Sequence, residues 1–230
     1  PIKKSQEMTF NREISGWIIN ILMLLVTIFL VIRRKNLGKN IQYFIIAMGL
    51  GTCIEFFNIF MRLRNPNYNS SFSYSIGVIL FVFLFLLIYF YQILESKKLK
   101  KIQLYLIIVF LLNYAISVLL IKDFFFFFLF ITNFVNTSLL LFSSVLLLNQ
   151  TFNSNRIMHL KSYFPFWASV GLIIIYTGVL PLTIISSVAD KSMNISIFYL
   201  FLAVFNTLGY SIILFGVFRA TSKKLTENAF

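Results

Sequence analysis

The sequence predicts an all-α integral membrane protein, and three observations support this fold class. The 230 residues are 59% hydrophobic and only 12% charged, whereas a soluble domain carries about twice that share of charge. The mean hydropathy is +0.88. The apolar residues also form long runs between short charged loops, each run close to the ~20 residues that cross a bilayer as a helix. A β-barrel is excluded because runs such as 76–91 do not alternate between apolar and polar residues.

The apolar runs predict a bundle of seven transmembrane helices in a single membrane domain, 1–230. The fourth and fifth runs are divided only by Lys122 and Asp123, and together they are too long for one span, so we predict a tight turn there. Seven spans leave about 90 residues for the termini and loops, too few for a separate soluble domain. The predicted helices cover 16–33, 41–61, 74–94, 102–121, 124–149, 163–187 and 195–218, followed by a short cytoplasmic tail, 219–230.

The distribution of basic residues predicts an outside N-terminus and a cytoplasmic C-terminus. Thirteen Lys and Arg residues fall on one side of the predicted spans and seven on the other, and the more basic side faces the cytoplasm. The net charge of +13 is explained in this way without a nucleic-acid partner. These side chains are expected to contact anionic lipid headgroups or an acidic cytoplasmic protein. The two densest clusters are Arg33, Arg34, Lys35 and Lys39, and Lys97, Lys98, Lys100 and Lys101.

Glu55 is the ionisable residue that lies well inside a predicted span. An acid at the centre of a span costs about 2.5–3.5 kcal/mol, so Glu55 should face the bundle rather than lipid. It precedes Arg62 by two helical turns, or ~10 Å, which places it in the outer leaflet. Asn58 and Arg62 share its helical face, and we expect Asn58 to donate to Glu55. The carboxyl is either a neutral or hydrogen-bonded packing group, or a ligand, cation or proton site open to the outside.

Asparagine and tyrosine side chains recur within the predicted spans. Buried amides in a membrane seek hydrogen-bond partners on neighbouring helices, and ordinary packing clamps are one interpretation. The alternative is a polar chamber at the depth of Glu55 that suits a small polar or amphipathic ligand. The residues concerned are Asn20, Asn113, Tyr114, Asn133, Asn136, Tyr176, Tyr199 and Asn206.

Gly178 and Pro181 lie in the predicted helix 163–187. Proline removes a backbone donor and crowds the preceding turn, so we expect a kink near the outer end of this helix. The kink serves either packing or a gating hinge. Elsewhere, Gly49 and Gly51 in the second predicted helix, and Gly209 and Gly216 in the last, are expected to let neighbouring helix backbones approach closely.

The residue sets that carry catalysis or bind metals are missing from the sequence. His159 is a single histidine on a predicted cytoplasmic loop, and Cys53 has no histidine within the spans. The segment 49–51 lacks the Lys-Ser/Thr pair of a phosphate-binding loop. We therefore expect no enzymatic activity, no cofactor and no metal ion.

Several features together resemble a set of small seven-helix inner-membrane proteins from Bacteroidota that are associated with signalling. They are Glu55 after Tyr43, the segment Tyr89-Phe90-Tyr91 before the basic turn 97–101, and Pro165-Phe166-Trp167 with Tyr176 and Pro181. The resemblance spans most of the chain and implies a role beside sensor kinases. It implies no catalytic residues.

These patterns favour a non-enzymatic sensor or receptor-like protein that passes an outer-leaflet or ligand signal to a cytoplasmic partner. An accessory or structural subunit of a larger membrane complex is the alternative, and small-molecule transport ranks third. The expected partners are the lipid bilayer and other membrane or cytoplasmic proteins. The abundance of Phe, with 29 residues, is typical of an AT-rich genome and favours a bacterial cytoplasmic membrane, with the mitochondrial inner membrane as the alternative.

Overall fold

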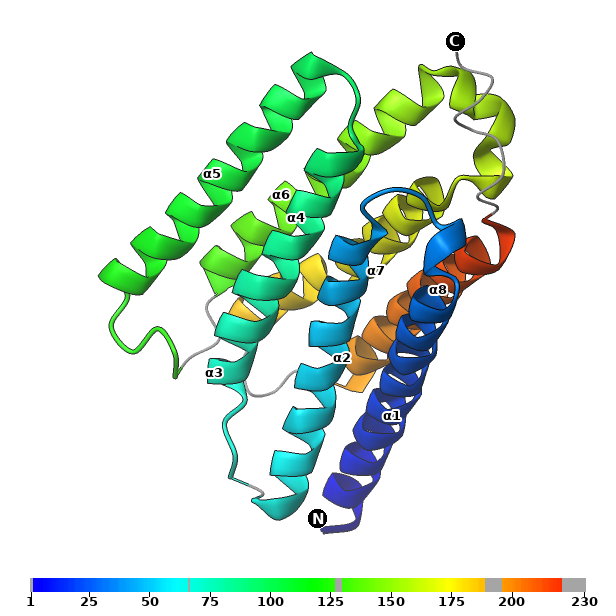
Figure 1. Cartoon of the computed structure of the whole chain (residues 1–230). Coiled ribbons are helices and arrows are strands. Elements are labelled where there is room, and N and C mark those ends of the chain that lie inside the picture. Colours follow the sequence, from blue (N-terminus) through cyan, green and yellow to red (C-terminus); the bar gives the residue numbers. More distant parts are fainter. Residues whose placement is uncertain (1, 66, 127–129, 189–195, 221–230) are drawn as a thin grey trace.

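The computed structural model describes residues 2–65, 67–126, 130–188 and 196–220, and these residues are helical except for short connections (Figure 1). No strand occurs in these four ranges. The long helices are α1 (Ile2–Ile32), α2 (Ile41–Arg64), a continuous rod made of α3 (Ser71–Ser73), η2 (Tyr74–Val82) and α4 (Phe83–Ile93), α5 (Lys97–Leu120), α6 (Phe130–Phe152), α7 (Phe164–Val188) and α8 (Ser196–Arg219). The short helical segment η1 (Arg34–Asn36) connects α1 to α2, and η3 (Asn155–Ser162) connects α6 to α7.

The chain is a helical membrane protein by the length and composition of its helices. Within the described residues, six helices are long and apolar enough to cross a bilayer. Leucine, isoleucine, valine and phenylalanine cover the outward faces of these helices, as expected for surfaces solvated by lipid. The apolar part of α1, Gly16–Ile32, has 17 residues and falls just short of the same length.

The helices pack around α4, which contacts α2, α5 and α6. The first and last helices of the described chain, α1 and α8, lie side by side, and α7 packs between α8 and α6 (Figure 1). Helix α5 lies at the opposite edge against α4 and α6. A continuous apolar core fills the bundle, and its fully buried large side chains include Leu30, Phe44, Leu87, Phe90, Phe110 and Leu147.

The closest helix pair is α7–α8, where two glycines face each other. A Cβ atom on Gly171 would lie 2.7 Å from the Gly209 carbonyl oxygen, and a Cβ on Gly209 would lie 2.7 Å from the Gly171 carbonyl oxygen. Further along, Gly216 faces Trp167 and Gly178 faces Phe205. The sequence-based expectation of close backbone approach is therefore confirmed for Gly209. Gly216 and Gly51 face side chains, and a Cβ on Gly49 would meet only Thr27 Cγ2 at 4.0 Å. Gly178 likewise provides close packing against α8, and α7 continues through Pro181 to Val188.

Three helix ends differ from the sequence prediction. The first helix begins at Ile2 rather than 16, and the fourth begins at Lys97 rather than 102, so its lysines lie in the first helical turns. The predicted two-residue turn between the fourth and fifth spans is wrong, because α5 ends at Leu120 and α6 begins at Phe130.

The phenylalanine-rich segment after α5 folds back instead of starting the next span. Asp123 has a left-handed backbone conformation with φ 61°, and its carbonyl accepts a hydrogen bond from the Phe126 N–H at 2.8 Å. Phe124 is buried, with its ring 5.4 Å from that of Tyr114. Hydrophobicity alone does not distinguish an apolar turn of this kind from the beginning of a helix. That is why the sequence prediction started the helix at 124.

Candidate functional site

The carboxylate of Glu55 on α2 faces the first residue of the π-helix η2. The Tyr74 hydroxyl lies 2.8 Å from both Glu55 oxygens, so it donates to the carboxylate across the α2–η2 contact. Glu55 thus faces another helix, as the cost of an acid in lipid requires. The Tyr210 hydroxyl of α8 is near enough to experience the Glu55 charge, and it bonds the Met23 sulfur of α1 at 3.5 Å.

Asn58 lies one turn beyond Glu55 and is completely buried. Its Oδ1 accepts hydrogen bonds from the hydroxyls of Tyr68, at 3.2 Å, and Ser73, at 2.5 Å. Its Nδ2 has no hydrogen-bond partner among the described residues. The predicted bond from Asn58 to Glu55 is therefore wrong: the Asn58 Nδ2 does not bond the carboxylate, and the Asn58 oxygen fastens α2 to the segment that follows it.

Arg62 is exposed at the end of α2 and does not fold back onto the carboxylate. Its Nη2 donates to the Ser70 hydroxyl at 3.3 Å. It remains close enough to influence Glu55 and Tyr74 electrostatically. We call Glu55, Asn58, Tyr68, Ser73 and Tyr74 the Glu55 cluster.

The Glu55 cluster adjoins an unusual piece of helix. Residues Tyr74–Val82 form nine residues of π-helix, a conformation that normally occurs as a single turn and often marks functional positions. Gly77 lets this segment approach α2, because a Cβ there would collide with the Ile54 side chain. One residue after Tyr74, the Ser75 carbonyl accepts the Tyr114 hydroxyl of α5 at 3.2 Å. The start of the π-helix is thus held from two sides.

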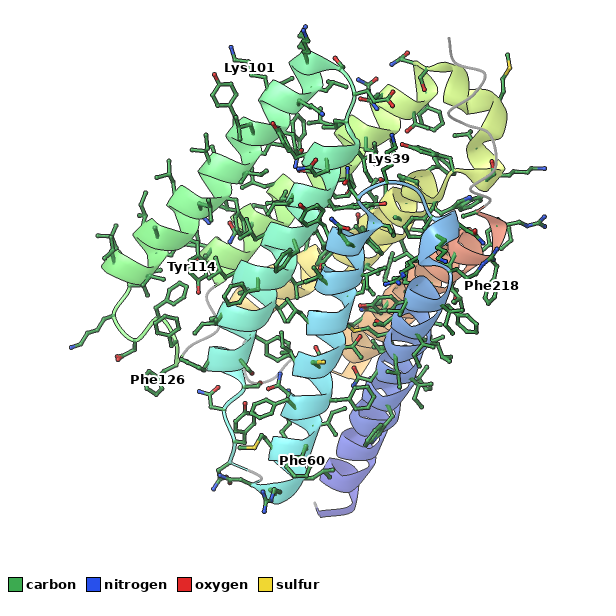
Figure 2. All side chains as sticks on the ribbon, in the orientation of Figure 1. Lys39, Phe60, Lys101, Tyr114, Phe126 and Phe218 are labelled. Atoms are coloured by element: carbon green, nitrogen blue, oxygen red, sulfur yellow. The ribbon has the colours of Figure 1, made fainter. Side chains whose placement is uncertain are left out.

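A second polar cluster joins α5 to α6. Asn113 Nδ2 donates to Asn136 Oδ1 at 2.9 Å, and the Thr132 and Ser117 hydroxyls are 2.7 Å apart. The Ser117 hydroxyl also donates to the Asn113 carbonyl at 2.7 Å. We call these four residues the Asn113 cluster. Tyr114, next to Asn113, links it to the π-helix (Figure 2).

The predicted chamber residues therefore separate into groups. Asn20 and Asn133 are buried, Asn206 donates to the Leu202 carbonyl of its own helix at 2.8 Å, and Tyr176 packs edge-on against the Phe83 ring. Within the described residues, these four side chains form no hydrogen bond or ring contact with the Glu55 cluster. Tyr199 lies outside the residues whose side chains are described.

The sequence analysis missed Tyr68, Ser73 and Tyr74, which supply the partners of Glu55 and Asn58. Pairing the two antiparallel helices by equal distance from their loop does not find these partners. Glu55 lies nine residues before Arg64, the last residue of α2, whereas Tyr74 lies three residues after Ser71, the first residue of α3. The pairing depends on how the connection between the two helices is folded, which the helical pattern of the sequence does not contain.

The two basic clusters, Arg33–Lys39 and Lys97–Lys101, lie at the end of the bundle opposite the Glu55 cluster. Figure 2 shows Lys39 and Lys101 at that end, away from Phe60 and Phe126. Arg33 is committed to the bundle, because its guanidinium donates to the carbonyls of Phe218, at 2.6 Å, and Ala220, at 3.4 Å. Lys100 lies over the Tyr91 ring. The remaining predicted contact residues, Arg34, Lys35, Lys39, Lys97, Lys98 and Lys101, are exposed.

Neither the comparisons with known proteins nor the residue types of the site assign it an activity. No family model, no curated protein and no solved structure matches the chain. Within the described residues, His, Cys, Asp and Glu form no group of three that would hold a metal ion. Cys53 is exposed on α2. What the arrangement offers chemically is a membrane-embedded carboxylate whose partner hydroxyl begins a π-helix.

Proposed function

We propose that this chain is a non-enzymatic sensor of seven transmembrane helices, with its N-terminus outside and its C-terminus in the cytoplasm. The hydrogen bond between Glu55 and Tyr74 carries the proposal, because it ties the half-buried acid directly to the first residue of the π-helix. The seventh span is α1, whose helix extends on the N-terminal side of its apolar part. The Lys and Arg asymmetry supports the orientation.

In this proposal, a cationic or hydrogen-bonding ligand at the outer end competes for the Glu55 carboxylate. Competition releases Tyr74, and the freed π-helix rewinds toward α-helical geometry. Rewinding changes the number of residues per turn between Tyr74 and Val82 and therefore turns α4 about its axis. A ligand moves this equilibrium only by its difference in affinity for the two windings.

In this proposal, the rotation of α4 is passed to a cytoplasmic partner at the inner end of the helix. The backbone N–H groups of Glu95 and Ser96 donate to Gln150 Oε1 of α6, at 2.8 and 3.3 Å. The basic first turns of α5 follow at once from Lys97. A rotation of α4 would move these lysines relative to α6 and alter a docking surface for an acidic cytoplasmic protein. The resemblance to signalling-associated membrane proteins supports the same role.

The alternative role, an accessory subunit, is favoured by α5. This helix packs only at one edge of the bundle, and residues such as Leu119 and Leu120 are about four-fifths exposed, at 82% and 78%. A neighbouring subunit would cover this apolar face of α5 in place of lipid. The polar residues of the spans argue for sensing, since Asn58, Asn133 and Asn136 point into the bundle rather than toward a neighbour.

The test is purification of the tagged protein in lipid nanodiscs, followed by mass spectrometry of the proteins that co-purify. Sensing predicts one cytoplasmic signalling companion whose recovery changes at least threefold in Glu55→Gln, while the lipid-facing control Tyr105→Phe leaves it unchanged. A fixed stoichiometric set of other membrane proteins, insensitive to Glu55→Gln, would instead establish the subunit role and refute sensing.

A further inference from the structure

Helix α6 buries most of its polar side chains inside the protein. Thr132, Asn136, Thr137, Ser144 and Thr151 are at most 1% exposed. The outward face carries large apolar side chains, namely Ile131, Phe134, Phe142, Val145 and Phe152. In a bilayer, such a helix depends on the protein interior for every hydrogen bond of its polar face.

Most hydroxyls on this face find their partner within the helix. Ser143 donates to the Leu139 carbonyl, Ser144 to the Leu140 carbonyl, and Thr151 to the Leu147 carbonyl, at 2.8–3.0 Å. These bonds to the residue four positions earlier are a common way to satisfy a hydroxyl in a helix. The polarity of α6 by itself therefore requires no additional molecule.

Two adjacent side chains are different. Asn136 Nδ2 and Thr137 Oγ1 have no partner among the described residues, although both residues are 0% exposed. The Asn136 oxygen is already used, because it accepts from Asn113 Nδ2. An unpartnered amide and an unpartnered hydroxyl at successive positions, both shielded from lipid, are unfavourable unless a small molecule bonds them.

We infer that a buried water molecule binds at Asn136 and Thr137, beside the Asn113 cluster. Water fits because it accepts from the amide N–H and both donates to and accepts from a hydroxyl, as internal waters do in polar sites. The neighbouring Asn113 cluster consists of uncharged amides and hydroxyls, which suit a neutral molecule and give no countercharge to an ion. This water extends the α5–α6 hydrogen-bond network one residue further, from Asn136 to Thr137. The inference does not rest on the proposed function.

The first test is the thermal stability of Thr137→Val in nanodiscs, with Thr151→Val as the matched control. Both changes replace a buried hydroxyl by a methyl group, but only the Thr151 hydroxyl has a protein partner. If water bonds Thr137, Thr137→Val lowers Tm by about 2–4 °C, and by more than Thr151→Val. A raised or unchanged Tm for Thr137→Val would overturn the inference, because removal of an unpartnered hydroxyl does not destabilise.

The second test is hydroxyl-radical labelling by X-ray radiolysis, which oxidises buried side chains that lie next to bound water. Leu140 lies one turn beyond Asn136 and Thr137, and Leu147 lies on the same face two turns further along; both are 0% exposed. We expect Leu140 to be oxidised at least threefold faster than Leu147, and this excess to disappear in Thr137→Val. Equal oxidation of the two leucines would refute a water at this position.

Discussion

At the scale of single residues, Glu55 is the costliest group that the described spans contain, and its surroundings determine its role. An isolated acid in a span costs about 2.5–3.5 kcal/mol. The Tyr74 hydroxyl, 2.8 Å from both oxygens, offsets part of this cost by donating to the carboxylate. The tyrosine thereby becomes the residue through which any change at Glu55 reaches the π-helix.

Tyr74→Phe removes this donor while keeping the ring. We expect a destabilisation of about 1–3 kcal/mol, because Glu55 loses its hydroxyl partner inside the bundle. Thermal unfolding in nanodiscs measures the change, with Tyr105→Phe as the control, since Tyr105 is 55% exposed on α5. Equal Tm values for the two variants would show that the Glu55–Tyr74 contact contributes nothing to stability.

Asn113 and Asn136 form a direct bond between two spans, and a double-mutant cycle measures its contribution. We expect a coupling energy of about 0.6 kcal/mol between Asn113→Ala and Asn136→Ala, the average for hydrogen bonds between membrane helices. Asn113→Ala combined with Asn206→Ala serves as the control, because Asn206 bonds its own helix. Strictly additive effects of Asn113→Ala and Asn136→Ala would contradict the bond.

The sequence predicted which residue types matter but only part of their pairing. The prohibition on acids and amides facing lipid correctly predicts that Glu55 and Asn58 turn inward. Their partners depend on the phase of two helices and on the loop between them, which periodicity along one helix does not contain. The expected Asn58–Glu55 bond is absent for this reason: the Asn58 oxygen accepts from Tyr68 and Ser73, while its Nδ2 has no partner among the described residues.

At the scale of helices, the α7–α8 pair depends on the absence of two side chains. Gly209→Ala places a Cβ against the Gly171 carbonyl oxygen and the Ile175 side chain, so the backbones must separate. We expect a loss of about 1–3 kcal/mol, as for other overpacked contacts. Chemical or thermal unfolding measures it.

Gly49→Ala is the matched control on α2. The nearest atom to its Cβ would be Thr27 Cγ2 at 4.0 Å, an ordinary contact. Alanine also favours the helix over glycine by up to about 1 kcal/mol, so we expect unchanged or slightly increased stability. A result in which Gly49→Ala destabilises as much as Gly209→Ala would argue against close backbone contact as the cause.

Helix positions were predictable to different degrees. Apolar runs located the middle of each long helix because burial in lipid requires them. The predicted helix starts at 16, 102 and 124 are wrong, because charge and hydrophobicity do not decide where a helix begins. Lys97 is charged and helical, whereas Phe124 is apolar and not helical. The π-helix has no signal in composition, since it depends on how Gly77 and Ser75 meet α2 and α5.

At the scale of the whole molecule, the proposed orientation separates the Glu55 cluster from the two basic clusters, Arg33–Lys39 and Lys97–Lys101, by the thickness of the membrane. In a Cys53→Ser background, Asn67→Cys and Lys39→Cys lie at opposite ends of α2, and both positions are exposed. We expect a membrane-impermeant maleimide to label Asn67→Cys on intact cells, and Lys39→Cys only after permeabilisation. The reverse pattern would invert the proposed topology.

The contact between α1 and α8 has a consequence for biosynthesis. Arg33 at the end of α1 binds carbonyls at the end of α8, and the Phe29 and Phe218 rings lie 4.8 Å apart, so residues more than 180 positions apart close the bundle. During translation α1 therefore enters the membrane long before its partner leaves the ribosome. Until then its inner face must be shielded by lipid, by the insertion machinery or by α2, which makes closure of the bundle the final step of folding.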